Sequence, residues 1–286
     1  MNLKPAKAVT DDDVTAYERD GVVCLRQVFD QEWIERLVKA VERTMANPGK
    51  RGRELVKDAN PGRFLMNTFM WRSDADYRAL ALESPMIDVA ATLMRADKIA
   101  FFYDQLFVKA PGTRAITQWH HDLPFWPLRG EQIVSIWLAL TPVTLQMSGV
   151  EYIAGSHKWG KFYRAETPDG DPRFTNMALE SCPDFFDEKN REGKRFLAWD
   201  LQPGDVICHH PLTLHGARGN ASQTQRRIGI SLRYTGDDAR WDPREFVMSI
   251  EGEPEKSLKA GDPPILDGVF PVVWVRDRAT AGAGAS

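Results

Sequence analysis

Six histidines occur in the 286 residues, and five of them fall in two short segments. Two are adjacent in TQWHHDLPFW, three lie in CHHPLTLHGA, and His157 stands apart. Histidine is the commonest neutral metal ligand and the usual acid–base group near neutral pH. Such clustering in a histidine-poor chain indicates metal or acid–base chemistry, and buried structural histidines are the alternative.

The first segment predicts two ligands for one metal ion. If residues 115–122 form a strand, His120 and Asp122 share one face of it and His121 lies on the other. A His-x-Asp pair joined by one distant histidine is the two-histidine, one-carboxylate facial triad, which leaves open positions and suits ferrous iron in oxygen chemistry. The distant ligand must come from the second segment. By spacing alone, its three histidines all remain candidates: His209, His210 and His215.

An arginine beyond the second segment predicts an anion site. In RRIGISLRY, strand alternation places Arg226 with the apolar residues, while Arg227 and Arg233 face the other way. We take the apolar face as the inward one, where the charge of Arg226 would need a buried anionic partner. The carboxylate of a small diacid is a natural partner, because a guanidinium binds it through two parallel hydrogen bonds. An internal arginine–carboxylate bridge is the alternative.

The elements that must position these residues change in character near residue 98. Caps and periodic apolar residues predict helices over 10–21, over 30–47 and from 84 onward, with one strand within 22–29. Later segments are short, rich in β-branched and aromatic residues, and bounded by turn residues, as in an antiparallel barrel or sandwich. These segments are 99–109, 115–122, 132–141, 149–154, 204–210 and 226–234.

The chain is expected to form a single domain over residues 1–286. Residues 1–98 would be its mainly helical N-terminal part, 99–235 its β core, and 236–286 a C-terminal extension and tail. Within the core, residues 158–198 are charged and rich in proline and glycine, which predicts an inserted loop and a candidate lid. The final RATAGAGAS is expected to be unstructured.

Composition excludes several functional classes. The chain is 43% hydrophobic and 27% charged, and its formal charge of -3 lacks the basic excess of a nucleic-acid-binding protein. No apolar run approaches the length of a membrane span, and the start has no secretory signal pattern. Three scattered cysteines suit a reducing compartment. The expectation is a cytoplasmic protein that acts on a small molecule, without nucleic-acid or membrane partners.

Several motifs in order resemble the phytanoyl-CoA dioxygenase family of iron(II)- and 2-oxoglutarate-dependent oxygenases. They are YERDGVVCLRQVF, DQLFVKAPGT, WHHDLPFW, SIWLALTPVT, SGVEYIAGSHKWG, PGDVICHHPLTLHGARGN and RRIGISLRY. The resemblance implies a mainly β fold with flanking helices, the double-stranded β-helix or cupin-like jelly roll. It also implies that the metal ligands are His120, Asp122 and His215, and that the cosubstrate arginine is Arg226.

The resemblance further implies a reaction and a pocket. Iron(II), 2-oxoglutarate and O2 would hydroxylate an unactivated C–H bond of a small-molecule substrate, with succinate and CO2 as coproducts. Gln105 and Trp137 correspond to family positions that help to hold 2-oxoglutarate. The substrate pocket is expected to include four aromatic residues near these positions: Tyr103, Phe107, Phe125 and Trp126.

Other functions of the same residues stay open at this point. Desaturation, epoxidation or cyclisation in secondary metabolism would use the same centre with a differently placed substrate. Halogenation is disfavoured because a halogenase lacks the carboxylate ligand that Asp122 provides. A cupin-like metal protein without oxygenase activity would leave the diacid-binding role of Arg226 unexplained, and a metal-free structural role is a remote third reading.

Overall fold

The computed structural model describes residues 1–55, 62–165, 174 and 178–277. Two predicted helices are present with the expected N-caps: α1 (Asp11–Asp20) is capped by Thr10, and α2 (Gln31–Ala46) by Asp30. Helix α4 (Met86–Met94) follows Pro85. Helix α3 (Ala75–Glu83), capped by Asp74, was not predicted from the sequence. Short 3-10 helices are η1 Gly49–Arg51, η2 Met70–Arg72, η3 Leu123–Phe125, η4 Ser156–Lys158, η5 Glu188–Asn190 and η6 Pro254–Lys256.

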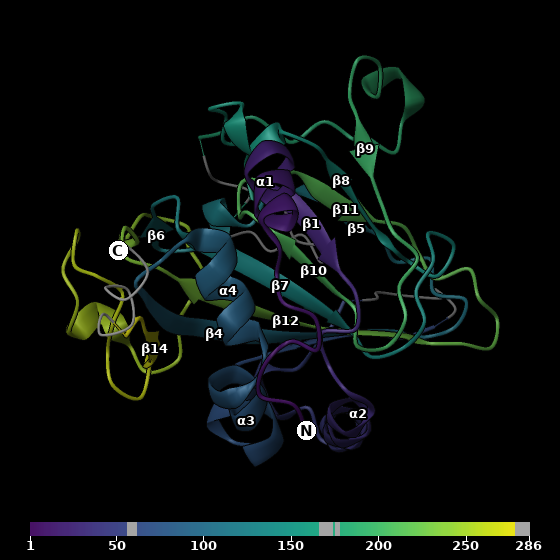
Figure 1. Cartoon of the computed structure of the whole chain (residues 1–286). Helices are drawn as coiled ribbons and strands as arrows, with labels where there is room; N and C mark the ends of the chain where they lie inside the picture. Colours follow the sequence, from purple (N-terminus) through teal and green to yellow (C-terminus); the bar gives the residue numbers. More distant parts are fainter. Residues whose placement is uncertain (56–61, 166–173, 175–177, 278–286) are drawn as a thin grey trace.

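The strands form two main antiparallel sheets (Figure 1). The large sheet, in spatial order, holds β1 (Val22–Leu25), β10 (Val206–His209), β7 (Ile133–Ala139), β12 (Arg227–Thr235), β4 (Lys98–Lys109), β3 (Phe64–Thr68) and β2 (Arg53–Glu54). Strand β14 (Val272–Val275) also pairs with β4. The small sheet holds β5 (Thr117–His120), β11 (His215–Ala217), β8 (Val150–Ile153) and β9 (Phe196–Leu197). A separate pair joins β6 (Leu128–Arg129) to β13 (Arg240–Trp241).

The N-terminal part contributes more to the sheet than the sequence predicted. Strand β1 pairs with β10, and the β2–β3 pair extends the large sheet beyond β4. In residues 1–98, helices alternate with short strands that join the large sheet, so this part of the chain is not a separate helical unit. These strands are short and lie at or near the sheet margin, where the sequence signal for a strand is weakest.

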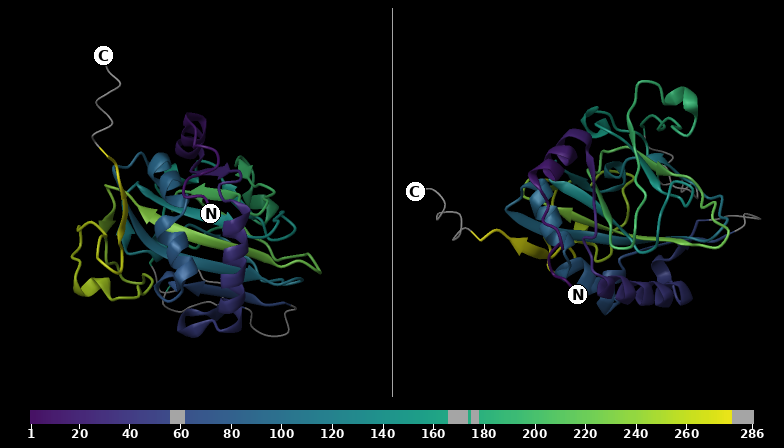
Figure 2. Two further views of the ribbon diagram at one scale, coloured as in Figure 1. Left: turned by 60° about the horizontal axis from the view of Figure 1, so that its bottom comes forward. Right: turned by 45° about the vertical axis from the view of Figure 1, so that its right-hand side comes forward.

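The large sheet is buried on both faces. Helices α1 to α4 cover one face, and the small sheet lies over the other (Figures 1 and 2). On the helical side, Trp33 and Leu37 of α2 belong to the same apolar cluster as Ile228, Ile230 and Leu232 of β12. The apolar face of β12 therefore packs against the helices, and its other face looks toward the small sheet.

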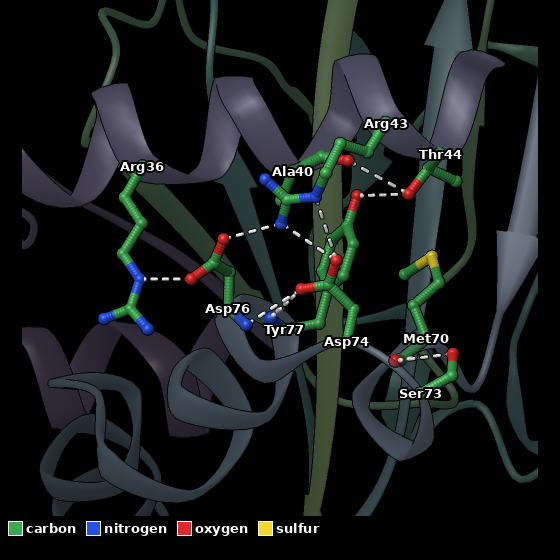
Figure 3. A network of polar contacts seen from close by, with 9 residues as sticks. All are labelled: Arg36, Ala40, Arg43, Thr44, Met70, Ser73, Asp74, Asp76 and Tyr77. Carbon is green, nitrogen blue, oxygen red and sulfur yellow. Dashed lines mark hydrogen bonds and ion pairs between the residues drawn. The ribbon is translucent and has the colours of Figure 1, made fainter. Parts of the chain in front are cut away.

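A polar network fixes α2 to α3 on the outside of the molecule (Figure 3). Arg36 pairs with Asp76 at 2.6 Å, and Arg43 reaches both Asp74 at 2.8 Å and Asp76 at 2.6 Å. Asp74 also caps α3 by accepting hydrogen bonds from backbone amides. Asp74 thus both caps α3 and, together with Asp76, attaches it to α2, so the two helices keep a fixed position relative to each other.

The observed architecture confirms the predicted fold class, a mainly β jelly roll with flanking helices. All six predicted core segments correspond to strands, namely β4, β5, β7, β8, β10 and β12, and each observed end lies within about two residues of the expected one. The predicted loop 158–198 includes residues 166–173 and 175–177, which lie outside the described residues, as does the tail 278–286. Among the described helices, none is long and apolar enough to cross a membrane.

Candidate metal centre and its cavity

Three predicted ligands converge between the two sheets. His120 ends β5 and His215 begins β11, and the two residues are direct cross-strand partners. The ligand atoms of His120, Asp122 and His215 all lie within 4.8 Å of one another. Asp122 Oδ1 is 3.7 Å from His120 Nε2 and 3.9 Å from His215 Nε2. Two neutral nitrogen donors and one carboxylate at this spacing fit an iron(II) ion.

Asp122 reaches the centre by a route that differs from the prediction. Strand β5 stops at His120, and Asp122 has helical backbone angles, φ -73° and ψ -38°, at the start of η3. Its amide donates to the carbonyl of Pro211 at 2.8 Å, which ties the turn to the segment between β10 and β11. A turn, and not strand alternation, therefore brings the carboxylate back beside His120.

Backbone carbonyls orient both histidine rings. Nδ1 of His120 lies 2.7 Å from the carbonyl oxygen of Gln118, and Nδ1 of His215 lies 2.9 Å from that of Thr213. A carbonyl only accepts, so each Nδ1 carries the proton and each Nε2 keeps its lone pair free for a metal ion. Partners of this kind fix the tautomer and the orientation of metal-binding histidines.

His209 is a further polar residue at the centre, and its place there could not be predicted from spacing. It is buried, and its Nε2 donates to Asp122 Oδ2 at 3.3 Å. Burial by itself would raise the pKa of Asp122, but this hydrogen bond and the charge of Arg233 hold the pKa well below its usual range. Burial lowers the pKa of His209 and of His215, which favours neutral imidazoles.

The remaining histidines point elsewhere. Nε2 of His121 accepts a hydrogen bond from the amide of Tyr163 at 2.8 Å, and burial lowers the pKa of His121 to about 4. His210 lies 3.5 Å from Glu131, and its ring faces that of His157. His121 and His210 therefore lie outside the centre.

A cavity of about 350 Å³ opens onto the three converging side chains. Six of the seven residues that were predicted for the cosubstrate and substrate positions line it: Gln105, Trp137, Tyr103, Phe107, Phe125 and Trp126. Trp126 Nε1 donates to the hydroxyl of Tyr103 at 2.9 Å, so the aromatic wall is internally fixed. Gln105 Nε2 lies 2.7 Å from Met66 Sδ.

The predicted position of Arg226 is wrong. Its guanidinium is paired with the carboxylate of Glu42 on α2, and its side chain is 34% exposed. Alternation along the strand is as predicted, but the apolar face belongs to the helical side, so Arg226 follows that face away from the cavity. An amphipathic helix needs an apolar surface to cover, and the strong periodicity of residues 31–46 was the signal that could have shown this.

Two other arginines of the strand line the cavity instead. Arg227 and Arg233 are each 3% exposed, and neither forms an ion pair with any carboxylate of the described residues. The Nε atoms of both lack a hydrogen-bond partner among the described residues. The guanidinium of Arg227 lies 4.8 Å from the ring centre of Trp137. Burial lowers the pKa of Arg227 to about 10, since desolvation penalises its charge.

Gly229 makes room for this arrangement, and its replacement provides a test. A Cβ atom at position 229 would lie 1.9 Å from Cζ2 of Trp137, so Gly229→Ala must displace the indole that lies beneath Arg227. We expect a loss of about 1–3 kcal/mol in the free energy of unfolding, measured by urea denaturation. The cost should fall in a Trp137→Leu background, where the clash is relieved. An equal cost in both backgrounds would show that the indole is not the obstacle.

The fold and the site together define a class: jelly-roll oxygenases in which a facial triad faces a cosubstrate cavity. The sequence model of the phytanoyl-CoA dioxygenase family matches residues 17–228. The chain belongs to this family. Its members use iron(II), 2-oxoglutarate and O2, and these are the cofactor and cosubstrates of the chain.

Proteins of similar sequence are also named dioxygenases. The multifunctional dioxygenase prhA of Penicillium brasilianum is 24% identical over 262 residues, which cover 86% of this chain and 78% of that protein. The ectoine dioxygenase of Sphingopyxis alaskensis is 24% identical over 272 residues, covering 89% and 87%.

Solved structures share the fold at low identity. The 2-oxoglutarate-dependent carbocyclase SnoK from nogalamycin biosynthesis superposes with a TM-score of 0.75 and 22% identity, covering 96% of this chain and 100% of SnoK. The epimerase SnoN, in complex with Fe3+, 2-oxoglutarate and nogalamycin RO, gives 0.72 and 20%, covering 92% and 98%.

Proposed function

We propose that the protein hydroxylates an unactivated C–H bond of a small-molecule substrate, with conversion of 2-oxoglutarate and O2 to succinate and CO2. His120, Asp122 and His215 are the metal ligands in this proposal. The observation that carries it is the shared cavity. The triad, whose Nε2 atoms are free because backbone carbonyls hold the Nδ1 protons, lines the same cavity as two buried arginines. Neither arginine has a carboxylate partner among the described residues.

Arg227 is the residue that we assign to the far carboxylate of 2-oxoglutarate. Its charge is buried without an ion pair among the described residues, and such a charge is costly unless a ligand supplies the anion. Lys109 does not take over this role, because its Nζ donates to the carbonyl of Arg218 at 3.0 Å, and burial and the charge of Arg227 both lower its pKa well below the usual value. Trp137 covers one face of the Arg227 guanidinium and leaves its in-plane donors for a planar carboxylate.

Iron(II) in this site would supply the oxidising chemistry that breaks the C–H bond. The chain's own residues position and protect that reaction. His209 holds Asp122 Oδ2, so Oδ1 faces the two histidines. Tyr103, Phe125 and Trp126 form an aromatic wall that excludes water and takes the apolar body of a substrate.

The outcome of C–H oxidation depends on where the substrate lies. The names of SnoK and SnoN describe cyclisation and epimerisation on the same fold, so desaturation, epoxidation, ring closure or epimerisation is the alternative to hydroxylation for this chain. A cupin-like metal protein without oxygenase activity would leave Arg227 without a purpose.

Binding and product analysis test the proposal. We expect 2-oxoglutarate to bind the anaerobic iron(II) protein in calorimetry but not the metal-free protein, and succinate to form when O2 is admitted to the iron(II) protein. In a substrate screen, the product of hydroxylation gains one oxygen atom, desaturation and ring closure remove two hydrogens, and epimerisation leaves the mass unchanged. Metal-independent binding of 2-oxoglutarate, or no binding at all, would contradict the proposed cofactor site.

A further inference from the structure

Arg233 is a second buried cation in the cavity, and 2-oxoglutarate does not account for it. It lies on the same face of β12 as Arg227 and is 3% exposed. Its only hydrogen bond among the described residues is a long one, 3.4 Å from Nη1 to the carbonyl oxygen of Ser231. Its Nε has no partner there, and no described carboxylate lies within ion-pair distance. A buried guanidinium in this state is set up to receive an anion.

The two arginines define separate sites. Six residues of extended strand separate them, about 20 Å between Cα atoms. Each guanidinium is held by its own aromatic ring, Arg227 over Trp137 at 4.8 Å and Arg233 over Tyr103 at 4.5 Å. The two carboxylate carbons of 2-oxoglutarate are only about 5 Å apart. If one end of 2-oxoglutarate is at the metal and the other at Arg227, its carboxylates are both used, and Arg233 remains.

The nearby carboxylates do not satisfy Arg233. Its charge interacts with Asp122 and Asp104 and contributes to lowering the pKa of Asp122. Asp122 is committed to the metal centre, where a bound cation would cancel its charge. Asp104 is turned toward η2, where its Oδ2 accepts a hydrogen bond from the amide of Trp71 at 3.0 Å. With a metal ion present, the net charge around Arg233 is positive.

We propose that Arg233 binds a carboxylate of the primary substrate, so the enzyme acts on carboxylic acids with an apolar body. This inference rests on the proposed function. Tyr103 and Trp126 lie against the guanidinium at 4.5 and 5.7 Å, which leaves its edge for one planar group. A phosphate dianion would keep an uncompensated buried charge beside a single arginine, so a carboxylate fits better. The aromatic wall next to Arg233 suits the apolar part.

The rim of the cavity on this side is basic as well. Arg51 and Lys50 line it, and the Arg51 guanidinium lies 5.0 Å from the ring centre of Phe69, which stacks on Tyr103. The guanidinium of Arg51 is 3.6 Å from the carboxylate of Glu251, which partly balances the charge of Arg51. Lysine and arginine at an entrance attract anions and raise their local concentration.

A substrate need not be known to test this inference. The full-length protein is loaded with Zn(II), which does not react with O2, and with 2-oxoglutarate. Binding of 3-phenylpropanoate is then compared with that of its uncharged amide, 3-phenylpropanamide, by ligand-observed NMR titration. We expect the acid to bind about ten- to a hundredfold more tightly than the amide. Arg233→Met should abolish this preference, and Arg233→Lys should retain part of it because the charge remains.

Matched controls separate the possible failures. Arg226→Met removes an arginine from the opposite face of the same strand and should keep the preference for the acid. The affinity for 2-oxoglutarate should be unchanged in Arg233→Met, and circular dichroism should show that each variant is folded. In one case the wild type binds Zn(II) and 2-oxoglutarate and yet shows equal affinity for the acid and the amide, and in another it binds neither of these two probes. Either result overturns the inference while the cofactor site stands. If Arg233→Met loses 2-oxoglutarate instead, Arg233 is a cosubstrate residue and the inference fails. If wild type does not bind Zn(II) and 2-oxoglutarate together, the proposed function itself fails.

Discussion

Alanine in place of His120, Asp122 or His215 is expected to remove iron from the purified protein and to abolish succinate formation. In the proposed site each residue supplies one of three protein ligands, and the ring nitrogens of His120 and His215 are already oriented by backbone carbonyls. Loss of an outer partner of a metal ligand usually costs 10–100-fold in metal affinity, so loss of a ligand should exceed about a hundredfold. Metal content by atomic emission and metal titration of each variant measure the effect.

The doubled histidines provide matched controls for this experiment. His121→Ala and His210→Ala should keep one iron per chain, because His121 faces Tyr163 and His210 faces Glu131. We expect His209→Ala to reduce the affinity for iron by roughly 10–100-fold, less than the loss of a proposed ligand and more than the loss of His121 or His210. The reason is that His209 holds Asp122 without being one of the three proposed ligands. Iron lost from a folded His121 variant and retained in a folded His120 variant would reverse the assignment.

Removal of the Arg227 side chain is expected to raise the 2-oxoglutarate concentration needed for half-maximal binding by about one to two decades. A hydrogen bond to a charged partner contributes roughly 1.5–3 kcal/mol, and nothing else among the described residues pairs with that guanidinium. Arg227→Met keeps much of the apolar stem that packs near Trp137. The measurement is calorimetric titration of the anaerobic iron(II) protein with 2-oxoglutarate.

Arg226 is the natural control for Arg227, because the two are neighbours in the chain and lie on opposite sides of the sheet. Arg226→Met should leave 2-oxoglutarate affinity unchanged, and should cost no more than about 1 kcal/mol of stability through its exposed pair with Glu42. A large loss of 2-oxoglutarate affinity in the Arg226 variant, with little change in the Arg227 variant, would restore the original prediction from the sequence.

Local patterns in the sequence predicted much of the fold. The caps at Thr10 and Asp30 and the periodicity of residues 31–46 specify helices that the structure contains, since these signals act within one or two turns. Strand composition and turn residues located the main strands of the core. Strands β2 and β3, near one margin of the large sheet, and helix α3 were missed, because short elements are stabilised by their tertiary neighbours more than by their own composition.

The sequence predicted that His120, Asp122 and His215 lie together, and they do, but partly for a different reason. His120 and Asp122 were expected on one face of a strand, and they do lie together, but a turn after His120 is what returns the carboxylate. Spacing left His209, His210 and His215 equivalent. The pairing of β11 with β5 decides among them, because it sets His215 opposite His120, whereas His209 lies on β10 of the large sheet and reaches only Asp122.

Which arginine faces the cavity was decided by the tertiary structure alone. Strand β12 is buried along its whole length, so alternation separates Arg226 from Arg227 and Arg233 but does not say which layer covers which face. The helices take the apolar face, because Trp33 and Leu37 of α2 belong to the same buried apolar cluster as Ile230 and its neighbours on that face. The face that holds Arg227, Gly229, Ser231 and Arg233 is left for the cavity, where a ligand can supply the missing anions. The sequence determined the two faces of this strand, and only the packing of helices on one side and the small sheet on the other determined their environments.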